Sequence, residues 1–132
     1  MVALAQELPL DRRQLSGPAL RTFFNIANKW QLGPDEQMKL LGVTARSTFY
    51  KWKKDAEVAL PRDTLERISY IFGIYKALQV LFPNEAADAW VKKANSAKPF
   101  TGRSALERML SGNVADLYVV RQYLDAQRGG WA

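Results

Sequence analysis

One segment, residues 60–83, constrains the fold more than any other part of the chain. It reads LPRDTLERISYIFGIYKALQVLFP, with apolar side chains at every third or fourth position and few polar ones beyond Ile71. This spacing predicts a buried helix at the centre of the molecule. Pro61 suits the start of that helix and Pro83 ends it. The predicted apolar stripe consists of Leu65, Ile68, Phe72, Tyr75, Leu78 and Phe82.

The same segment carries two further indications. Charged and polar side chains interrupt it, so it has no run of about 20 apolar residues, which argues against a membrane span. Gly73 lies inside the predicted helix, where a missing side chain leaves room for another element. We therefore expect a neighbouring helix to approach closely at Gly73.

Composition limits the possible functions. The chain has 132 residues, of which 48% are hydrophobic, enough for one core or two small ones. Its net charge of +6 favours an acidic partner, most commonly nucleic acid. The absence of cysteine and histidine excludes disulfides, thiol nucleophiles, histidine bases and ordinary zinc sites. The sequence also lacks a catalytic acid pair and a phosphate-binding glycine loop, so we expect neither an enzyme nor a cofactor.

Three short helices are predicted before the central one. The first covers residues 17–30, where apolar side chains recur at intervals of three and four. The second lies between Gly33, its cap, and Gly42, its end. The third covers residues 45–55, and the hydroxyl of Thr44 is expected to cap it.

The third helix is basic. Residues 44–54 carry four positive charges and no negative charge, while Phe49 and Trp52 are spaced to face inward. A basic helix that follows a short helix and a glycine-containing turn is typical of a helix-turn-helix, which places its second helix in the major groove of DNA. The candidate DNA-binding residues are Thr44, Arg46, Ser47, Tyr50, Lys51, Lys53 and Lys54.

Within this set we expect different roles. Arg46 and Ser47 lie near the start of the helix and are expected to reach base edges, whereas the lysines neutralise phosphates. The alternative is a plain three-helix bundle whose lysines face solvent.

Three more helices are predicted after Pro83. The first covers residues 85–95 behind Asn84 as its cap. A loop over residues 95–103 follows, from which Phe100 is expected to enter the core. Ser104 and Glu107 form a capping box that begins the next, short helix. In the first of these helices the side chains expected to face inward are Ala86, Ala89, Trp90 and Val91.

The last helix is expected to begin at Asn113. Arg121 and Arg128 should lie on its outer side, opposite an apolar stripe made of Val114, Leu117, Val120 and Leu124. The whole chain is therefore predicted to be all-α, with about seven helices: an N-terminal helix-turn-helix bundle followed by a C-terminal helical domain.

Both ends of the chain are expected to be simple. Residues 1–15 show no basic region followed by an apolar core, so we expect a flexible arm and not a secretory leader. The other end reads RGGWA, a short tail with one large aromatic residue, Trp131. This tryptophan either folds back onto the domain or anchors a partner, since tryptophan and arginine are common at interface hot spots.

Several of these segments resemble a known family. LLGVTARSTFYKWKK resembles the Xre/Cro-type helix-turn-helix, with a turn one residue longer than its commonest form. RDTLERISYIFGIYKALQVLFP, WVKKANSAKPFTGRSALERMLSG and DLYVVRQYLDAQRGGW resemble the toxin-binding domain of Xre/MbcA/ParS antitoxins. The resemblance implies three parts: an arm over residues 1–15, a DNA-binding domain over 16–59 and a toxin-binding domain over 60–132.

The resemblance also implies a function. Such proteins are antitoxins of type II toxin-antitoxin systems in the bacterial cytoplasm, usually encoded beside a RES-domain toxin that degrades NAD. The chain would block the active site of that toxin and repress its own operon by binding operator DNA, as a homodimer within a toxin-antitoxin hetero-oligomer. From the sequence of the last helix and tail, the residues expected to bind the toxin are Arg121, Arg128, Gly129, Gly130 and Trp131.

Two other functions are compatible with these sequence features. One is a stand-alone helix-turn-helix transcription regulator whose C-terminal domain dimerises or senses a ligand. The other is a protein-interaction module whose helix-turn-helix no longer binds DNA. A neighbouring toxin gene distinguishes the antitoxin from the regulator, and DNA binding at low salt distinguishes both from the module.

Overall fold

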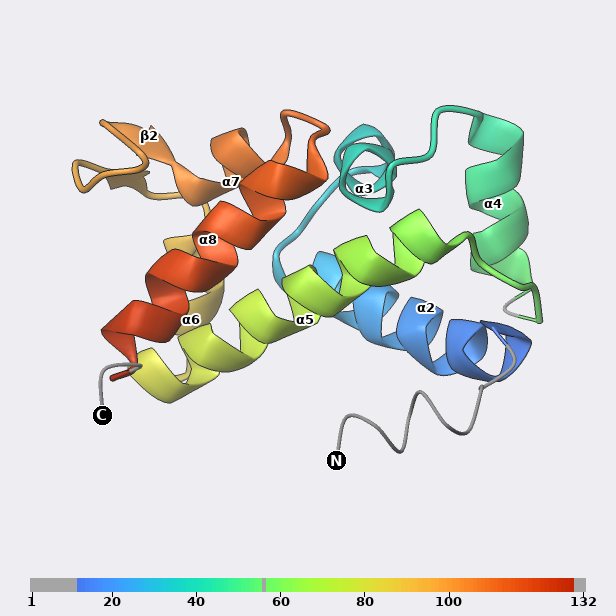
Figure 1. Cartoon of the computed structure of the whole chain (residues 1–132), viewed down its shortest axis with the longest axis horizontal. Coiled ribbons are helices and arrows are strands. Elements are labelled where there is room, and N and C mark those ends of the chain that lie inside the picture. The colour runs from blue at the N-terminus through green and yellow to red at the C-terminus, as the bar shows by residue number, and fades with distance from the viewer. Residues whose placement is uncertain (1–11, 56, 130–132) are drawn as a thin grey trace.

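The computed structural model describes residues 12–55 and 57–129 and is built from helices (Figure 1). Those residues form seven α-helices and one antiparallel pair of two-residue strands, β1 and β2, which confirms the all-α prediction. The strands are β1 (Ala94–Asn95) and β2 (Arg103–Ser104). The helices are α2 (Arg12–Lys29), α3 (Pro34–Leu41), α4 (Arg46–Lys54), α5 (Arg62–Leu81), α6 (Asn84–Trp90), α7 (Ala105–Met109) and α8 (Val114–Gln127).

The central helix is α5, as the sequence predicts. Its 20 residues extend over roughly 30 Å and contact α2, α3, α6 and α8. The buried face is rotated from the predicted stripe, because Phe72 is 42% exposed while Ile71 and Ile74 are fully buried. Helices pack against α5 on more than one side, and this decides which positions are covered. None of the described helices combines the length and the apolar character that crossing a membrane requires.

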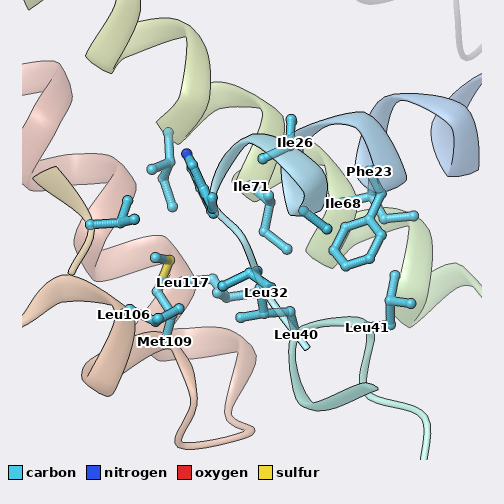
Figure 2. Close-up of a cluster of buried hydrophobic side chains, with 14 of the residues drawn as sticks. Phe23, Ile26, Leu32, Leu40, Leu41, Ile68, Ile71, Leu106, Met109 and Leu117 are labelled. Atoms are coloured by element: carbon cyan, nitrogen blue, oxygen red, sulfur yellow. The ribbon is translucent and has the colours of Figure 1, made fainter. Parts of the chain in front are cut away.

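A continuous hydrophobic core joins the two halves of the chain (Figure 2). Phe23 of α2 and Leu41 of α3 belong to it, as do Ile71 of α5 and Leu117 of α8. Segments before and after α5 in the sequence therefore share one core, with α5 between them.

The first helix begins earlier than predicted. It starts at Arg12 and continues through Pro18, which is exposed, although Gly17 and Pro18 were expected to mark its start. A tertiary contact holds the early turn: the buried Ser16 Oγ accepts a hydrogen bond from the Leu60 backbone N–H at 2.8 Å. This contact joins α2 to the segment before α5, which local sequence rules do not detect.

The next two helices follow the prediction except at one cap. Gly33 caps α3, with its N–H bonded to the Glu36 carboxylate at 3.0 Å, and Gly42 ends it in the left-handed conformation. Thr44 was expected to cap α4 but does not, because the cap residue is Ala45, whose carbonyl accepts from the Phe49 N–H. The hydroxyl of Thr44 lies one position too early to cap the helix.

The region after α5 departs most from the prediction. α6 ends at Trp90 instead of residue 95, and Pro83, not Asn84, is its cap. The chain then forms β1, which pairs with β2 and closes the intervening loop. The predicted inward face is right in part: Val91 is buried and Trp90 packs half-buried against the core. However, Ala87 is buried, whereas Ala86 and Ala89 are exposed.

Other predictions for this region are confirmed. Phe100 is 2% exposed, with its ring 5.0 Å from that of Tyr123 on α8. Ser104 and Glu107 form the capping box of α7. Buried residues on α8 are Leu117, Val120 and Leu124, while Val114 is half-buried.

Candidate functional site

The basic helix α4 presents its predicted contact residues on the surface. Phe49 and Trp52 are buried, and the Phe49 ring lies edge-on to Phe24 of α2, with centroids 6.1 Å apart. With these two side chains fixing the inner face, the polar side chains of α4 point away from the core. Exposed on α4 and the preceding turn are Thr44, Arg46, Ser47, Tyr50, Lys51, Lys53 and Lys54.

Three of these side chains have partners within the chain, and the first is Tyr50, whose ring lies edge-on to that of Phe49 at 5.1 Å. The Lys53 ammonium lies 5.9 Å from the Phe24 ring centre and 5.8 Å from that of Phe49, a favourable cation–π position. Arg46 donates from Nη2 to Oδ1 of Asp35, in the first turn of α3. The Asp35 contact was not predicted, because the two residues lie 11 positions apart on different helices.

The turn between α3 and α4 is fixed by α5. A Cβ on Gly42 would lie 2.6 Å from Nε of Arg67, so the Arg67 guanidinium occupies the space beside the glycine. Arg67 in turn donates to Oδ2 of Asp63 at 2.8 Å, and Thr64 Oγ1 donates to the Leu41 carbonyl at 3.3 Å. These contacts set the end of α3 and hence the start of α4.

A second arginine–glycine contact joins α5 to α8. A Cβ on Gly73 would lie 2.1 Å from Nη1 of Arg121, which confirms that Gly73 allows close approach and shows that a guanidinium makes it. Arg121 also donates to Oδ2 of Asp125 at 3.1 Å, and its side chain is 35% exposed. The prediction that Arg121 lies outside is therefore wrong in part, since its side chain packs across α5.

An aromatic pair lies beside this contact. Tyr118 of α8 is 45% exposed, and its ring is edge-on to that of Tyr70 on α5 at 5.7 Å. Burial of the Tyr70 hydroxyl, followed by its hydrogen bond to the Glu66 carboxylate, raises the pKa of Tyr70. Sequence reasoning missed the pair, because no local pattern indicates that residues 48 positions apart meet.

The remaining predicted toxin-binding residues lie at the end of α8. Arg128 is the exposed C-terminal cap, about two turns beyond Arg121, and Gly129 has a positive φ of 89°. Gly130 and Trp131 lie outside the described residues. In residues 12–55 and 57–129 no three acidic side chains gather as ligands for a metal ion.

Comparisons with known proteins agree with this arrangement. Residues 9–73 match the antitoxin Xre-like helix-turn-helix domain. Residues 77–130 match the antitoxin Xre/MbcA/ParS C-terminal toxin-binding domain. The uncharacterized protein y4oB of Sinorhizobium fredii (strain NBRC 101917 / NGR234) is 56% identical over 112 residues, which cover 84% of each chain.

The helical fold, the exposed basic helix α4 and the two domain matches together define a helix-turn-helix protein with a toxin-binding region. The chain belongs to the Xre/MbcA/ParS family of antitoxins. Its partner is accordingly a toxin, and both matched domains are binding domains, not enzymes.

Proposed function

We propose that this antitoxin neutralises an NAD-consuming RES-domain toxin by blocking its active site, and represses its own operon by binding operator DNA. The observation that carries the proposal is the union, in one chain, of the toxin-binding match over residues 77–130 and the exposed basic helix α4. The choice of a RES-domain toxin rests on the family resemblance of the sequence.

The DNA-binding part of the proposal rests on the geometry of α4. Its inner face is anchored by Phe49 and Trp52, so its polar face is free to enter a major groove, which admits a helix. Arg46 and Ser47 at its start reach base edges. Lys51, Lys53 and Lys54 neutralise phosphates. A homodimer places two such helices in half-sites about one helical turn, roughly 34 Å, apart.

The toxin-binding part of the proposal concerns α8 and the chain that follows it. Arg128 and Gly129 end α8 at the surface and lead into Gly130 and Trp131. An indole ring is flat and largely apolar, so it suits a pocket shaped for the rings of a dinucleotide. Arg121, about two turns earlier on α8 and held against Gly73 and Asp125, contributes a partly exposed guanidinium.

Co-expression tests the antitoxin role. The product of the neighbouring gene is expressed alone and with this chain, and growth and cellular NAD are measured. We expect the neighbour alone to stop growth and deplete NAD, and co-expression to restore both. A neighbour that is harmless, or that stays toxic beside this chain, contradicts the proposal and favours a stand-alone transcription regulator.

A deletion tests the role of the tail. Chains lacking residues 128–132 are compared with the full chain for inhibition of the toxin and affinity for it. We expect a loss in both, because the deletion removes Arg128 and Trp131 together. Unchanged inhibition and affinity would show that the toxin contacts another surface.

Salt dependence tests the phosphate contacts. Duplex DNA containing the promoter of the operon is titrated at several salt concentrations with wild type, Lys51→Ala and Lys54→Ala. Each variant should lower the slope of log affinity against log salt by about one. Lys76→Ala on α5 is the matched control, with the same charge change, and should leave the slope unchanged. Equal slopes for all four proteins would exclude α4 as the phosphate-binding element.

A further inference from the structure

Asp35 and Arg46 connect the starts of the two helices of the helix-turn-helix. Asp35 lies in the first turn of α3, and Arg46 is the first residue of α4. Arg46 Nη2 donates to Asp35 Oδ1 while both side chains stay exposed, at 60% and 73%. Their backbones are fixed independently, by the Gly33 cap and by the left-handed Gly42 that ends α3. The pair therefore sits at a defined place on the polar side of α4.

The contribution of this pair to folding is small. Exposed ion pairs contribute little to stability, because water and salt screen them. Its larger effect is on the orientation of Arg46. A guanidinium carries five N–H donors in one plane, and Asp35 accepts from only one of its nitrogens. Among the described residues, Arg46 makes no other hydrogen bond, so the rest of its donor edge stays open.

An open, oriented guanidinium edge matches one base in particular. Guanine presents O6 and N7 side by side in the major groove, and arginine binds both with two parallel hydrogen bonds. A free arginine loses side-chain entropy when it adopts that geometry, whereas a side chain that is already held loses less. Asp35 also neutralises part of the charge of Arg46, which weakens its attraction for any nearby phosphate.

We propose that Asp35 is a positioning residue that orients Arg46 to recognise a guanine in the major groove, an inference that rests on the proposed DNA binding by α4. Asp35 need not contact DNA itself. Its removal should have two opposite effects. Discrimination at the guanine should fall, because Arg46 becomes free to bind phosphates. Affinity for DNA of unrelated sequence should rise, because a negative charge is lost.

Selection from a randomised duplex pool, followed by anisotropy titrations, tests this inference. The full-length wild type selects a preferred sequence, and its affinity is compared for that duplex and for copies with each guanine changed to adenine. We expect one guanine to matter by about ten- to a hundredfold, and Arg46→Ala to abolish that preference. Asp35→Ala and Asp35→Asn should lower this ratio by up to about fivefold, as expected when an exposed ion pair is removed, and should tighten binding to an unrelated duplex.

Two variants act as controls. Glu57→Gln removes the same charge from an exposed residue after α4 and should keep the guanine preference. Asp35→Glu keeps the carboxylate and should restore most of the preference. Thermal melting should be nearly unchanged in all of them, since the residues are exposed.

The possible outcomes separate the inference from the proposed function. A wild type that binds no DNA overturns both. A guanine preference that is as strong in Asp35→Ala and Asp35→Asn as in the wild type, or that survives in Arg46→Ala, overturns the role of Asp35 and leaves DNA binding intact. If Glu57→Gln causes the same loss of guanine preference, the effect comes from net charge, and the role of Asp35 is again overturned.

Discussion

Two arginine–glycine contacts join separate elements of the antitoxin, and they differ in how deeply the arginine is buried. In the N-terminal half, Arg67 packs on Gly42, and in the C-terminal half Arg121 packs on Gly73. Each arginine is paired with an aspartate four residues away on its own helix. However, the Arg67 side chain is only 11% exposed, and the Arg121 side chain is 35% exposed.

The two glycines are needed for different reasons. Gly42 has φ of 74°, a conformation that other residues rarely adopt, and it also leaves space for a buried guanidinium. Gly73 lies within α5 and has ordinary helical geometry, so only the space matters there. Its neighbour is the end of a flexible, partly exposed side chain, which can move away. The N-terminal contact should therefore tolerate change less than the C-terminal one.

The largest expected effect is that of Gly42→Ala. The positive φ costs about 1–2 kcal/mol, and the displaced Arg67 adds to it, so unfolding in urea should show a loss of about 2–3 kcal/mol. Gly112→Ala is the matched control, because Gly112 has φ of 90° but open space around it. If the two variants lose the same stability, the contact with Arg67 contributes nothing.

Removing each arginine compares the contacts directly. Arg67→Ala should lower the free energy of unfolding by about 1–3 kcal/mol, because it empties a buried position and leaves Asp63 without its partner. Arg121→Ala should cost less than about 1 kcal/mol, as expected for a partly exposed ion pair. Denaturant titrations of both variants measure the difference, and the reverse order would contradict the comparison.

Gly73→Ala should have a small net effect. Alanine favours a helix by about 1 kcal/mol over glycine, and this gain offsets the displacement of Arg121. In an Arg121→Ala background the displacement is absent, so adding Gly73→Ala should stabilise the protein by about 1 kcal/mol. A destabilised double variant would mean that α8 itself, and not the guanidinium, requires the glycine.

The smallest expected effect is the pH dependence of stability that comes from Asp116, a residue in the C-terminal half. The Ser111 hydroxyl and then Arg108 hold the pKa of Asp116 below its usual value, against the opposing effect of burial. The stabilisation from this carboxylate is present above its unfolded pKa and is lost as pH falls through the lowered folded pKa. Melting temperatures between pH 7 and strongly acidic pH should therefore fall less steeply for Asp116→Asn; equal slopes would argue against the shift.

Local sequence patterns predicted the fold where local interactions decide it. The bounds of α3, the inward anchors Phe49 and Trp52, and the capping box at Ser104 follow from spacing and cap chemistry. The predictions failed where contacts between distant residues determine the helix bounds. α2 begins at Arg12, before Pro18, and the Ser16–Leu60 hydrogen bond holds this early turn. α6 is shorter than predicted because the chain after it forms β1, which pairs with β2. The Asp35–Arg46 and Gly73–Arg121 contacts each join two helices, so no single segment could reveal both partners.

The position of α5 has a consequence for the turnover of the protein. Because α5 supplies core surface to the helices on both of its sides, neither the helix-turn-helix nor the toxin-binding region keeps its core once α5 is unfolded. A protease that pulls the chain in from either end should therefore remove both regions in one event, without releasing a folded fragment. Degradation then frees the toxin and removes the helix-turn-helix at the same moment. The number of intact chains therefore determines both how much toxin is bound and how much helix-turn-helix is present.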